Sequence, residues 1–257
     1  MAFLSMFLIL CGPFVGSFVQ ASANIWPDRS NAVQIHSVCQ HCHTKLKVFD
    51  LIPIVSYLWL RGKCRSCETS FGSAHLFTEC AAALIAISAV IVFNGWLMLV
   101  TALLGWVLLF ASLVDFRLRL LPDGATLGLT LAGAIVLFWQ AGVPGLWFAG
   151  LGAGFGYGVF YIIAKGYRIL RGRDGLGLGD AKLLAAGGAW AGPFALSWIV
   201  LLAACFALVG LWITSTIRGQ KPKADTALSF GPALALAIYL IWLWSGQGDE
   251  GLRLLYL

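Results

Sequence analysis

Charged side chains are scarce in this sequence, which has only 17 Lys and Arg and 11 Asp and Glu among 257 residues. Soluble domains carry roughly 25% charged residues, whereas this chain is 11% charged and 60% hydrophobic. The scarcity of charge excludes an ordinary soluble domain. Together with the apolar excess, it predicts an all-α protein that crosses a membrane several times.

The start of the chain also lacks positive charge, because no Lys or Arg precedes Arg29. A secretory signal peptide has a basic start, so this class of segment is disfavoured. The small residues Ala21-Ser22-Ala23 do resemble a cleavage site, which leaves cleavage as the alternative. We expect the first apolar run to remain in the protein as a membrane helix.

Apolar runs of about 20 residues are long enough to cross the hydrocarbon layer as helices. By length and interruption they predict about eight transmembrane helices. The expected helices are 2–20, 76–93, 95–114, 125–141, 145–165, 181–193, 195–214 and 229–246. The sixth is short, and its boundary falls at Gly192-Pro193.

The distribution of Lys and Arg predicts the orientation, because positive charge is retained on the cytoplasmic side of short loops. With the N-terminus outside, every Lys and Arg except Arg253 falls in a cytoplasmic segment. The net charge of +6 is therefore explained by topology. The lipid bilayer is the expected partner, and no nucleic acid is implied.

A polar segment at 21–75, between the first two apolar runs, contains two C-x-x-C pairs. The four residues are Cys39, Cys42, Cys64 and Cys67. Four thiolates in two such pairs satisfy tetrahedral zinc, so we expect a structural, zinc-ribbon-like site. Two disulfides are an alternative that reducing cytosol disfavours. Paired redox cysteines, or His41 or His43 in place of one thiolate, are further alternatives.

Most carboxylates lie in loops or in the C-terminal tail, where they are solvated, but four do not. These four are Glu79, Asp115, Asp123 and Asp180. Acidic residues at the edge of a membrane are costly and are usually functional. Asp123 follows Pro122 just before an apolar run, which favours a helix cap. Asp115 ends an apolar run, and its structural alternative is a boundary charge paired with Arg117 or Arg119.

Asp180 follows three glycines at alternate positions, 175, 177 and 179. Glycines allow the backbone to approach another helix or a substrate closely. The pattern lacks the G-x-G-x-x-G spacing and a P-loop Lys-Ser/Thr, so it does not support nucleotide binding. The predicted topology places Asp115 and Asp180 at the same cytoplasmic face on separate helices. Two carboxylates at one depth are what an aspartic dyad requires.

Two other functions remain open for these residues. A transporter or proton relay also uses acidic residues in the membrane, but it predicts carboxylates near the midplane and inverted repeats. A zinc-ribbon assembly scaffold would explain the cysteines alone, with both aspartates serving as helix caps.

Taken in order, these motifs closely resemble the type IV prepilin peptidases, the bifunctional membrane aspartic peptidases of bacterial pilus and type II secretion systems. The resemblance covers nearly the whole chain. It is carried by Gly16-Ser17-Phe18, both C-x-x-C pairs, the segment FDLIPIVSYLWLRGKCRSC with Glu79 beyond it, Asp115 with Leu121-Pro122-Asp123, and Gly177-Leu178-Gly179-Asp180 with Ala181-Lys182.

The resemblance implies that Asp115 and Asp180 are the catalytic aspartates, the second closing the G-x-G-D motif. The implied reaction cleaves the leader of a prepilin or pseudopilin after a glycine, at the cytoplasmic face of the bacterial inner membrane. The larger members, which carry the tetracysteine segment, then methylate the new N-terminus with S-adenosylmethionine. The chain would divide into a first helix (1–20), the tetracysteine segment (21–75) and the peptidase domain (76–257).

The sequence departs from the family pattern in two places. Gly16-Ser17-Phe18 continues as VQASANIWPDRS, where the family usually has an Asn-Val-like run leading to Arg-Leu-Pro. Gln40 and His43 stand where Pro and Gly are common. Both changes lie in the region implicated in methylation and leave the aspartates intact. Glu79 matches a recurrent family acid, for which substrate binding and a packing or pairing role are both open.

Overall fold

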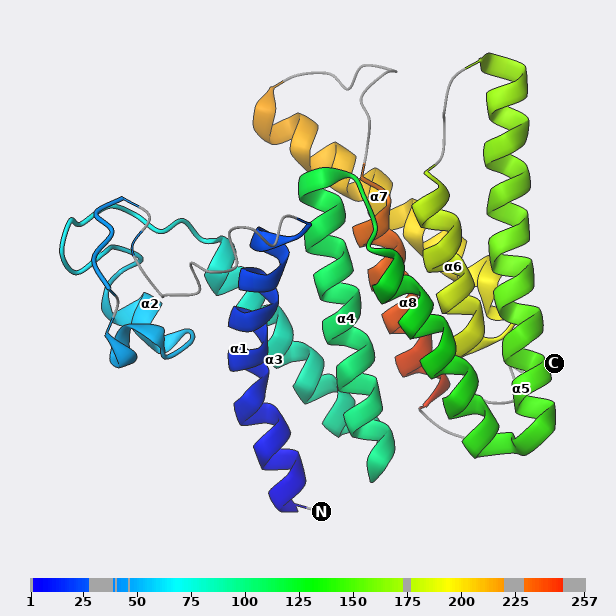
Figure 1. Cartoon of the computed structure of the whole chain (residues 1–257), viewed down its shortest axis with the longest axis horizontal. Coiled ribbons are helices and arrows are strands. Elements are labelled where there is room, and N and C mark those ends of the chain that lie inside the picture. The colour runs from blue at the N-terminus through cyan, green and yellow to red at the C-terminus, as the bar shows by residue number, and fades with distance from the viewer. Residues whose placement is uncertain are drawn as a thin grey trace. The chain divides into compact units, whose positions relative to one another are not determined.

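The computed structural model describes residues 2–27, 39, 41–45, 47–172, 177–219 and 229–246. These residues are helical apart from loops and isolated β-bridge residues, among them the antiparallel pair Lys63 and Ser70, which agrees with the predicted all-α class. The elements are α1 (Ala2–Ile25), η2 (Val48–Leu51), α2 (Val55–Trp59), α3 (Ala74–Val92), α4 (Trp96–Leu118), α5 (Asp123–Arg171), α6 (Leu178–Ala191), α7 (Ala195–Arg218) and α8 (Gly231–Ser245) (Figure 1). The expectations for Arg29, Gln40, Gly175 and Arg253 concern positions outside the described residues.

Several long apolar helices are present, as predicted, although the count of eight membrane crossings is not confirmed. Within the described residues, five helices are long and apolar enough to cross a membrane, namely α1, α3, α4, α5 and α7. Helices α6 and α8 have 14 and 15 residues. At 1.5 Å per residue they are only about 20 Å long, short of the roughly 30 Å hydrocarbon layer.

Helix α5 accounts for the rest of the difference between eight expected helices and five candidate spans, because it joins the runs expected at 125–141 and 145–165. Its 49 residues are interrupted at Gly142, where φ is 65° and ψ is −145°. This backbone conformation is one that glycine adopts readily and other residues avoid. The chain turns back at this point (Figure 1), so α5 consists of two helical segments.

The chain forms two compact units, residues 1–110 and 111–257. In the first unit, α1 packs against α3, and the contact depends on small residues. A Cβ at Gly16 would lie only 2.7 Å from the Cα of Glu79, so the two backbones touch. Nearby, the buried Thr78 hydroxyl donates a 2.7 Å hydrogen bond to the side-chain oxygen of Gln20. The pair satisfies polar groups that lipid could not.

In the second unit, α6 packs against α5, α7 and α8 and is buried along almost its whole length. Glycines make this possible, because a Cβ at Gly188 would lie 2.1 Å from the carbonyl oxygen of Gly152 on α5. Two residues further along α6, the Trp190 indole donates a 2.7 Å hydrogen bond to the Leu129 carbonyl. Its ring also meets Trp242 of α8 edge to face, with the centroids 5.0 Å apart. Helix α6 is thus fixed from several sides.

Candidate functional site

The four predicted zinc ligands lie together in the first unit. All seven cysteines carry free thiols, and the Sγ atoms of Cys39, Cys42, Cys64 and Cys67 lie within 4.8 Å of one another. The Cys39–Cys67 and Cys42–Cys64 Sγ distances are 3.8 and 3.9 Å. A tetrahedron with Zn–S bonds of about 2.3 Å has edges of about 3.8 Å, whereas a disulfide bond is about 2.05 Å. The donor set therefore fits one tetrahedral zinc ion.

Each half of this cluster is built by a tight turn of the backbone. In the first turn, the Cys39 amide donates to the Thr44 carbonyl at 3.0 Å, and the His43 amide donates to the Cys39 carbonyl at 2.9 Å. His43 has a φ of 54°, which closes the turn. The Thr44 hydroxyl lies 3.4 Å from the Sγ of Cys42. Its hydrogen bond, followed by one from the Thr44 amide, lowers the pKa of the Cys42 thiol to about 6.

The second turn repeats the first one bond for bond. The Cys64 amide donates to the Thr69 carbonyl at 2.9 Å, and the Glu68 amide donates to the Cys64 carbonyl at 3.0 Å. Glu68 has a φ of 57°, and the Thr69 hydroxyl lies 3.4 Å from the Sγ of Cys67. The backbone amides of Cys67 and Ser66 lower the pKa of Cys64. One cysteine in each turn, Cys42 in the first and Cys64 in the second, is thus biased toward the thiolate, the form that binds metal, whereas burial and hydrogen bonds with neighbouring cysteines raise the pKa of Cys39.

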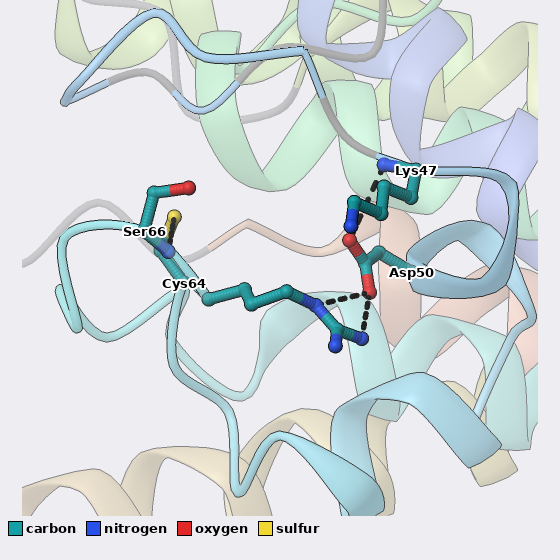
Figure 2. Close-up of polar contacts among 5 residues, drawn as sticks. Lys47, Asp50, Cys64 and Ser66 are labelled. Carbon is teal, nitrogen blue, oxygen red and sulfur yellow. Dashed lines mark hydrogen bonds and ion pairs between the residues drawn. The ribbon is translucent and has the colours of Figure 1, made fainter.

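Asp50, one of the loop carboxylates expected to be solvated, instead ties the second turn to η2 through a side chain that is only 5% exposed. The Arg65 guanidinium donates to Oδ1 of Asp50 at 2.6 and 3.2 Å, and the Lys47 amide donates to Oδ2 at 3.2 Å (Figure 2). Figure 2 also shows the Ser66 amide directed at the Sγ of Cys64. The hydrogen bonds from Arg65 hold the pKa of Asp50 below its ordinary value. Asp50 therefore remains charged and holds this part of the segment in place.

The second cluster contains Asp115 and Asp180, both in the second unit. Asp115 lies in the last turn of α4 and is 5% exposed, while Asp180 lies in the first turn of α6 and is 8% exposed. The negative charge of Asp115 acts directly on Asp180. The structure therefore brings together the two carboxylates that the sequence singled out. Buried acidic groups this close are costly unless they share a proton or have a function.

Helix α8 contributes to this cluster in a way the sequence did not reveal. The Ser229 hydroxyl donates a short hydrogen bond to Oδ2 of Asp115. At Gly231, a Cβ would lie 2.6 Å from the same oxygen and 2.8 Å from Cγ of Asp115. The absence of a side chain at Gly231 thus makes room for the carboxylate. The available signal was weak: a serine and a glycine just before a proline at the start of the last apolar run.

The prediction that Asp123 caps a helix is wrong. The N-cap of α5 is Pro122, with φ −65° and ψ 120°, and no side chain caps the helix. Proline suits this position because its fixed φ is compatible with the extended conformation, and because its missing N–H would have had no partner within the helix. The Asp123 carboxylate, as the first helical residue, instead forms a 2.6 Å ion pair with Lys182 of α6. This pair links the start of α5 to the turn that carries Asp180.

Two other predicted residues also have clear positions. Glu79 is buried in α3, and its Oε2 accepts a 2.7 Å hydrogen bond from the Ile54 amide. A Cβ at Gly179 would lie 3.0 Å from a methyl carbon of the Leu121 side chain, in the loop between α4 and α5, so the close contact here is with a loop side chain and not with the backbone of another helix. The described part of the chain gives His41 and His43 no place in the four-cysteine cluster.

Comparison with known families assigns both units. Residues 10–93 match the model described as the bacterial peptidase A24 N-terminal domain, and residues 102–214 match the type IV leader peptidase family. The first match contains the cysteine cluster and Glu79, and the second contains both aspartates. No solved structure matches the chain.

Curated relatives cover most of the sequence. A "Prepilin leader peptidase/N-methyltransferase" of Aeromonas hydrophila is 36% identical over 83% of this chain and 73% of its own. A protein of the same name in Burkholderia pseudomallei is 39% identical over 81% and 67%. The "Type 4 prepilin-like proteins leader peptide-processing enzyme" of Escherichia coli is 34% identical over 78% and 72%. On the strength of two consecutive domain matches and relatives that cover about four fifths of its length, the chain belongs to the type IV leader peptidase family.

Proposed function

We propose that this protein cleaves the leader peptide of type IV prepilins or type II secretion pseudopilins after a glycine. The observation that carries the proposal is the pair of buried, interacting carboxylates, Asp115 and Asp180. Both lie in the segment that matches the leader peptidase family. The relatives are named for this activity, which supports the same substrate class.

In this proposal Asp115 and Asp180 form an aspartic dyad. Two adjacent carboxylates cannot both ionise cheaply, so they share one proton. The ionised member takes a proton from a water molecule, which attacks the scissile carbonyl carbon. The protonated member donates to the carbonyl oxygen and so stabilises the tetrahedral intermediate. The carboxyl that took the water proton then gives it to the leaving nitrogen, while the other carboxylate recovers a proton from the gem-diol. Breakage of the C–N bond releases the leader with a new carboxylate and the mature chain with a new amine, and no covalent enzyme intermediate forms.

We assign the four-cysteine cluster to one structural zinc ion, held by Cys39, Cys42, Cys64 and Cys67. The near-tetrahedral spacing of the Sγ atoms supports this assignment. Zinc supplies folding free energy to a segment too small for a core of its own. It takes no part in the cleavage step.

A second activity, methylation of the new N-terminus, is proposed from the names of the relatives. S-adenosylmethionine is the methyl donor in this proposal. It would supply the methyl group that the new N-terminal amine receives. The segment at 21–75, in which the cysteines lie, is the part of the chain implicated in this reaction.

We further propose that the chain crosses the bacterial inner membrane eight times, with the N-terminus outside and both aspartates at the cytoplasmic face. The two segments of α5, together with α1, α3, α4, α6, α7 and α8, supply eight helical segments, of which the short α6 and α8 pack against each other and against α7. The distribution of Lys and Arg supports the orientation. The corresponding division is 1–20, 21–75 and 76–257.

The decisive experiment is cleavage of a co-expressed prepilin by the wild type, Asp115→Asn, Asp180→Asn and Asp123→Asn, with mass spectrometry of the product. The first two variants should lose about 10²–10⁴-fold in cleavage rate, the range expected for a general acid or base. Asp123 is 76% exposed at its side chain, and a surface ion pair contributes little, so its variant serves as the matched control. A gain of one methyl group on the wild-type product would establish the second activity. Continued cleavage by either of the first two variants would contradict the dyad.

A further inference from the structure

The segment between the two cysteine turns exposes a group of large apolar side chains. Phe49 is 77% and Trp59 is 79% exposed, and Leu51, Val55 and Leu58 are also exposed. We refer to these five residues, on η2 and α2, as the η2–α2 surface. A water-facing segment rarely leaves such side chains uncovered unless they meet a partner or a membrane.

Basic residues flank this surface on both sides in the chain. Lys45 and Lys47 precede η2, Arg61 and Lys63 follow α2, and all four side chains are exposed. Between residues 45 and 69, five described basic residues stand against two acidic ones, namely Asp50, which is already bound by Arg65, and Glu68. The surroundings of the η2–α2 surface are therefore cationic, which complements anionic lipid headgroups.

Contacts within the first unit set the level of the η2–α2 surface along α3. Residues 12 and 16 of α1 meet residues 82–86 and 78–82 of α3, so the two helices are antiparallel and Ile25 and Ala74 mark ends on one side. Glu79 holds the amide of Ile54, immediately before α2, at 2.7 Å. Glu79 lies five residues after the start of α3, which corresponds to about 7.5 Å along the helix axis. Interfacial segments lie about 5–10 Å deep.

The contact with Glu79 also prevents α2 from moving away from α3. Ile54 has a φ of 62°, a conformation that is costly for a β-branched residue and persists only when its surroundings enforce it. The Glu79 carboxylate is buried and directed at this amide. The start of α2 is therefore held at a fixed level beside a helix that is long and apolar enough to cross a membrane.

We propose that the η2–α2 surface inserts into the interfacial layer of the membrane, with Lys45, Lys47, Arg61 and Lys63 contacting anionic lipid headgroups. Aromatic and aliphatic side chains bordered by basic residues are the usual composition of such segments. The cysteine cluster would then be held against the bilayer rather than free in solution. The inference depends on α1 and α3 crossing the membrane and is independent of the peptidase activity.

The test uses the full-length protein in lipid nanodiscs that contain phosphatidylglycerol. A photoreactive benzophenone side chain replaces Trp59 in one sample, Glu68 in a second and Phe18 in a third, and lipid adducts are counted by mass spectrometry. Glu68 is exposed in the second cysteine turn, and Phe18 is exposed on α1. We expect at least fivefold more lipid adduct from position 59 than from 68, and a yield comparable to that from 18.

A yield from position 59 no higher than from 68, while 18 reacts, would overturn the proposal. So would an adduct from position 59 to a co-reconstituted prepilin in place of lipid, which would assign the surface to the substrate. Replacing phosphatidylglycerol with phosphatidylcholine should lower the yield at 59 at least twofold and leave the yield at 18 unchanged. An unchanged yield at position 59 would contradict the proposed contact between the four basic residues and anionic headgroups.

Discussion

A methyl group at Gly231 should displace one of the two proposed catalytic carboxylates. In Gly231→Ala, the new Cβ would lie 2.6 Å from Oδ2 and 2.8 Å from Cγ of Asp115. Ordinary contacts at a Cβ begin at about 3.4 Å, so the carboxylate must shift by about 0.8 Å. A misplacement of about 1 Å in a catalytic group costs about 10²-fold in rate, equivalent to about 2.7 kcal/mol. We expect kcat to fall by this factor while KM changes little.

The assay is cleavage of a purified prepilin by detergent-solubilised protein, with kcat and KM measured separately. Gly158→Ala on α5 is the matched control, because a Cβ there meets no other atom within 4 Å. Equal thermal unfolding of the two variants would show that Gly231→Ala is folded. A folded Gly231→Ala protein whose kcat is within threefold of wild type would refute the argument that Gly231 makes room for a catalytic Asp115.

Three further predictions concern the hydrogen bond to Asp115, the ion pair of Asp50 and the cysteine cluster. Ser229→Ala should lower kcat about tenfold, equivalent to about 1.4 kcal/mol, because Asp115 loses the hydrogen bond from this hydroxyl. Ser229→Thr, which keeps a hydroxyl, should restore most of the lost activity. Equal activity of the Ala and Thr variants would contradict a role for the hydrogen bond. Asp50→Asn should destabilise the protein by about 1 kcal/mol. Because Arg65 lowers the pKa of Asp50, the difference in thermal unfolding should be full above about pH 4 and disappear in acid as Asp50 protonates; a difference independent of pH would argue against the pair. Metal analysis should find about one zinc per chain and much less in Cys64→Ser, and full zinc occupancy in that variant would exclude Cys64 as a ligand.

Much of the fold was predictable because a membrane permits few structures. Backbone groups in hydrocarbon must be satisfied within a helix, so apolar runs become helices, as in α1, α3, α4 and α7. The cysteine cluster was predictable because each C-x-x-C pair forms its own local turn. Local sequence patterns do not show whether two neighbouring apolar runs form one helix or two. The merging of two expected helices into α5, with an interruption at Gly142, was therefore not predicted.

The surroundings of the aspartates were less predictable. Ser229 lies 114 positions from Asp115, and no local pattern connects a serine before one helix to an acid at the end of another. Asp123 was assigned to a cap because Asp is common there, but Pro122 fills the N-cap and leaves the carboxylate free for Lys182. Both differences arise from contacts between helices, which depend on packing rather than on sequence neighbours.

The burial of α6 limits how any molecule can reach Asp180. Residues 183–191 are all buried, whereas Gly177 and Leu178 at the N-terminal end of the helix are exposed. A peptide cannot approach along the sides of this helix, which are occupied by α5, α7 and α8. Among the described residues, the exposed part of the helix is its N-terminal end at Gly177 and Leu178. A bulkier side chain in place of Leu178 should therefore obstruct long substrates more than short ones, so substitutions at this position could be used to control substrate access.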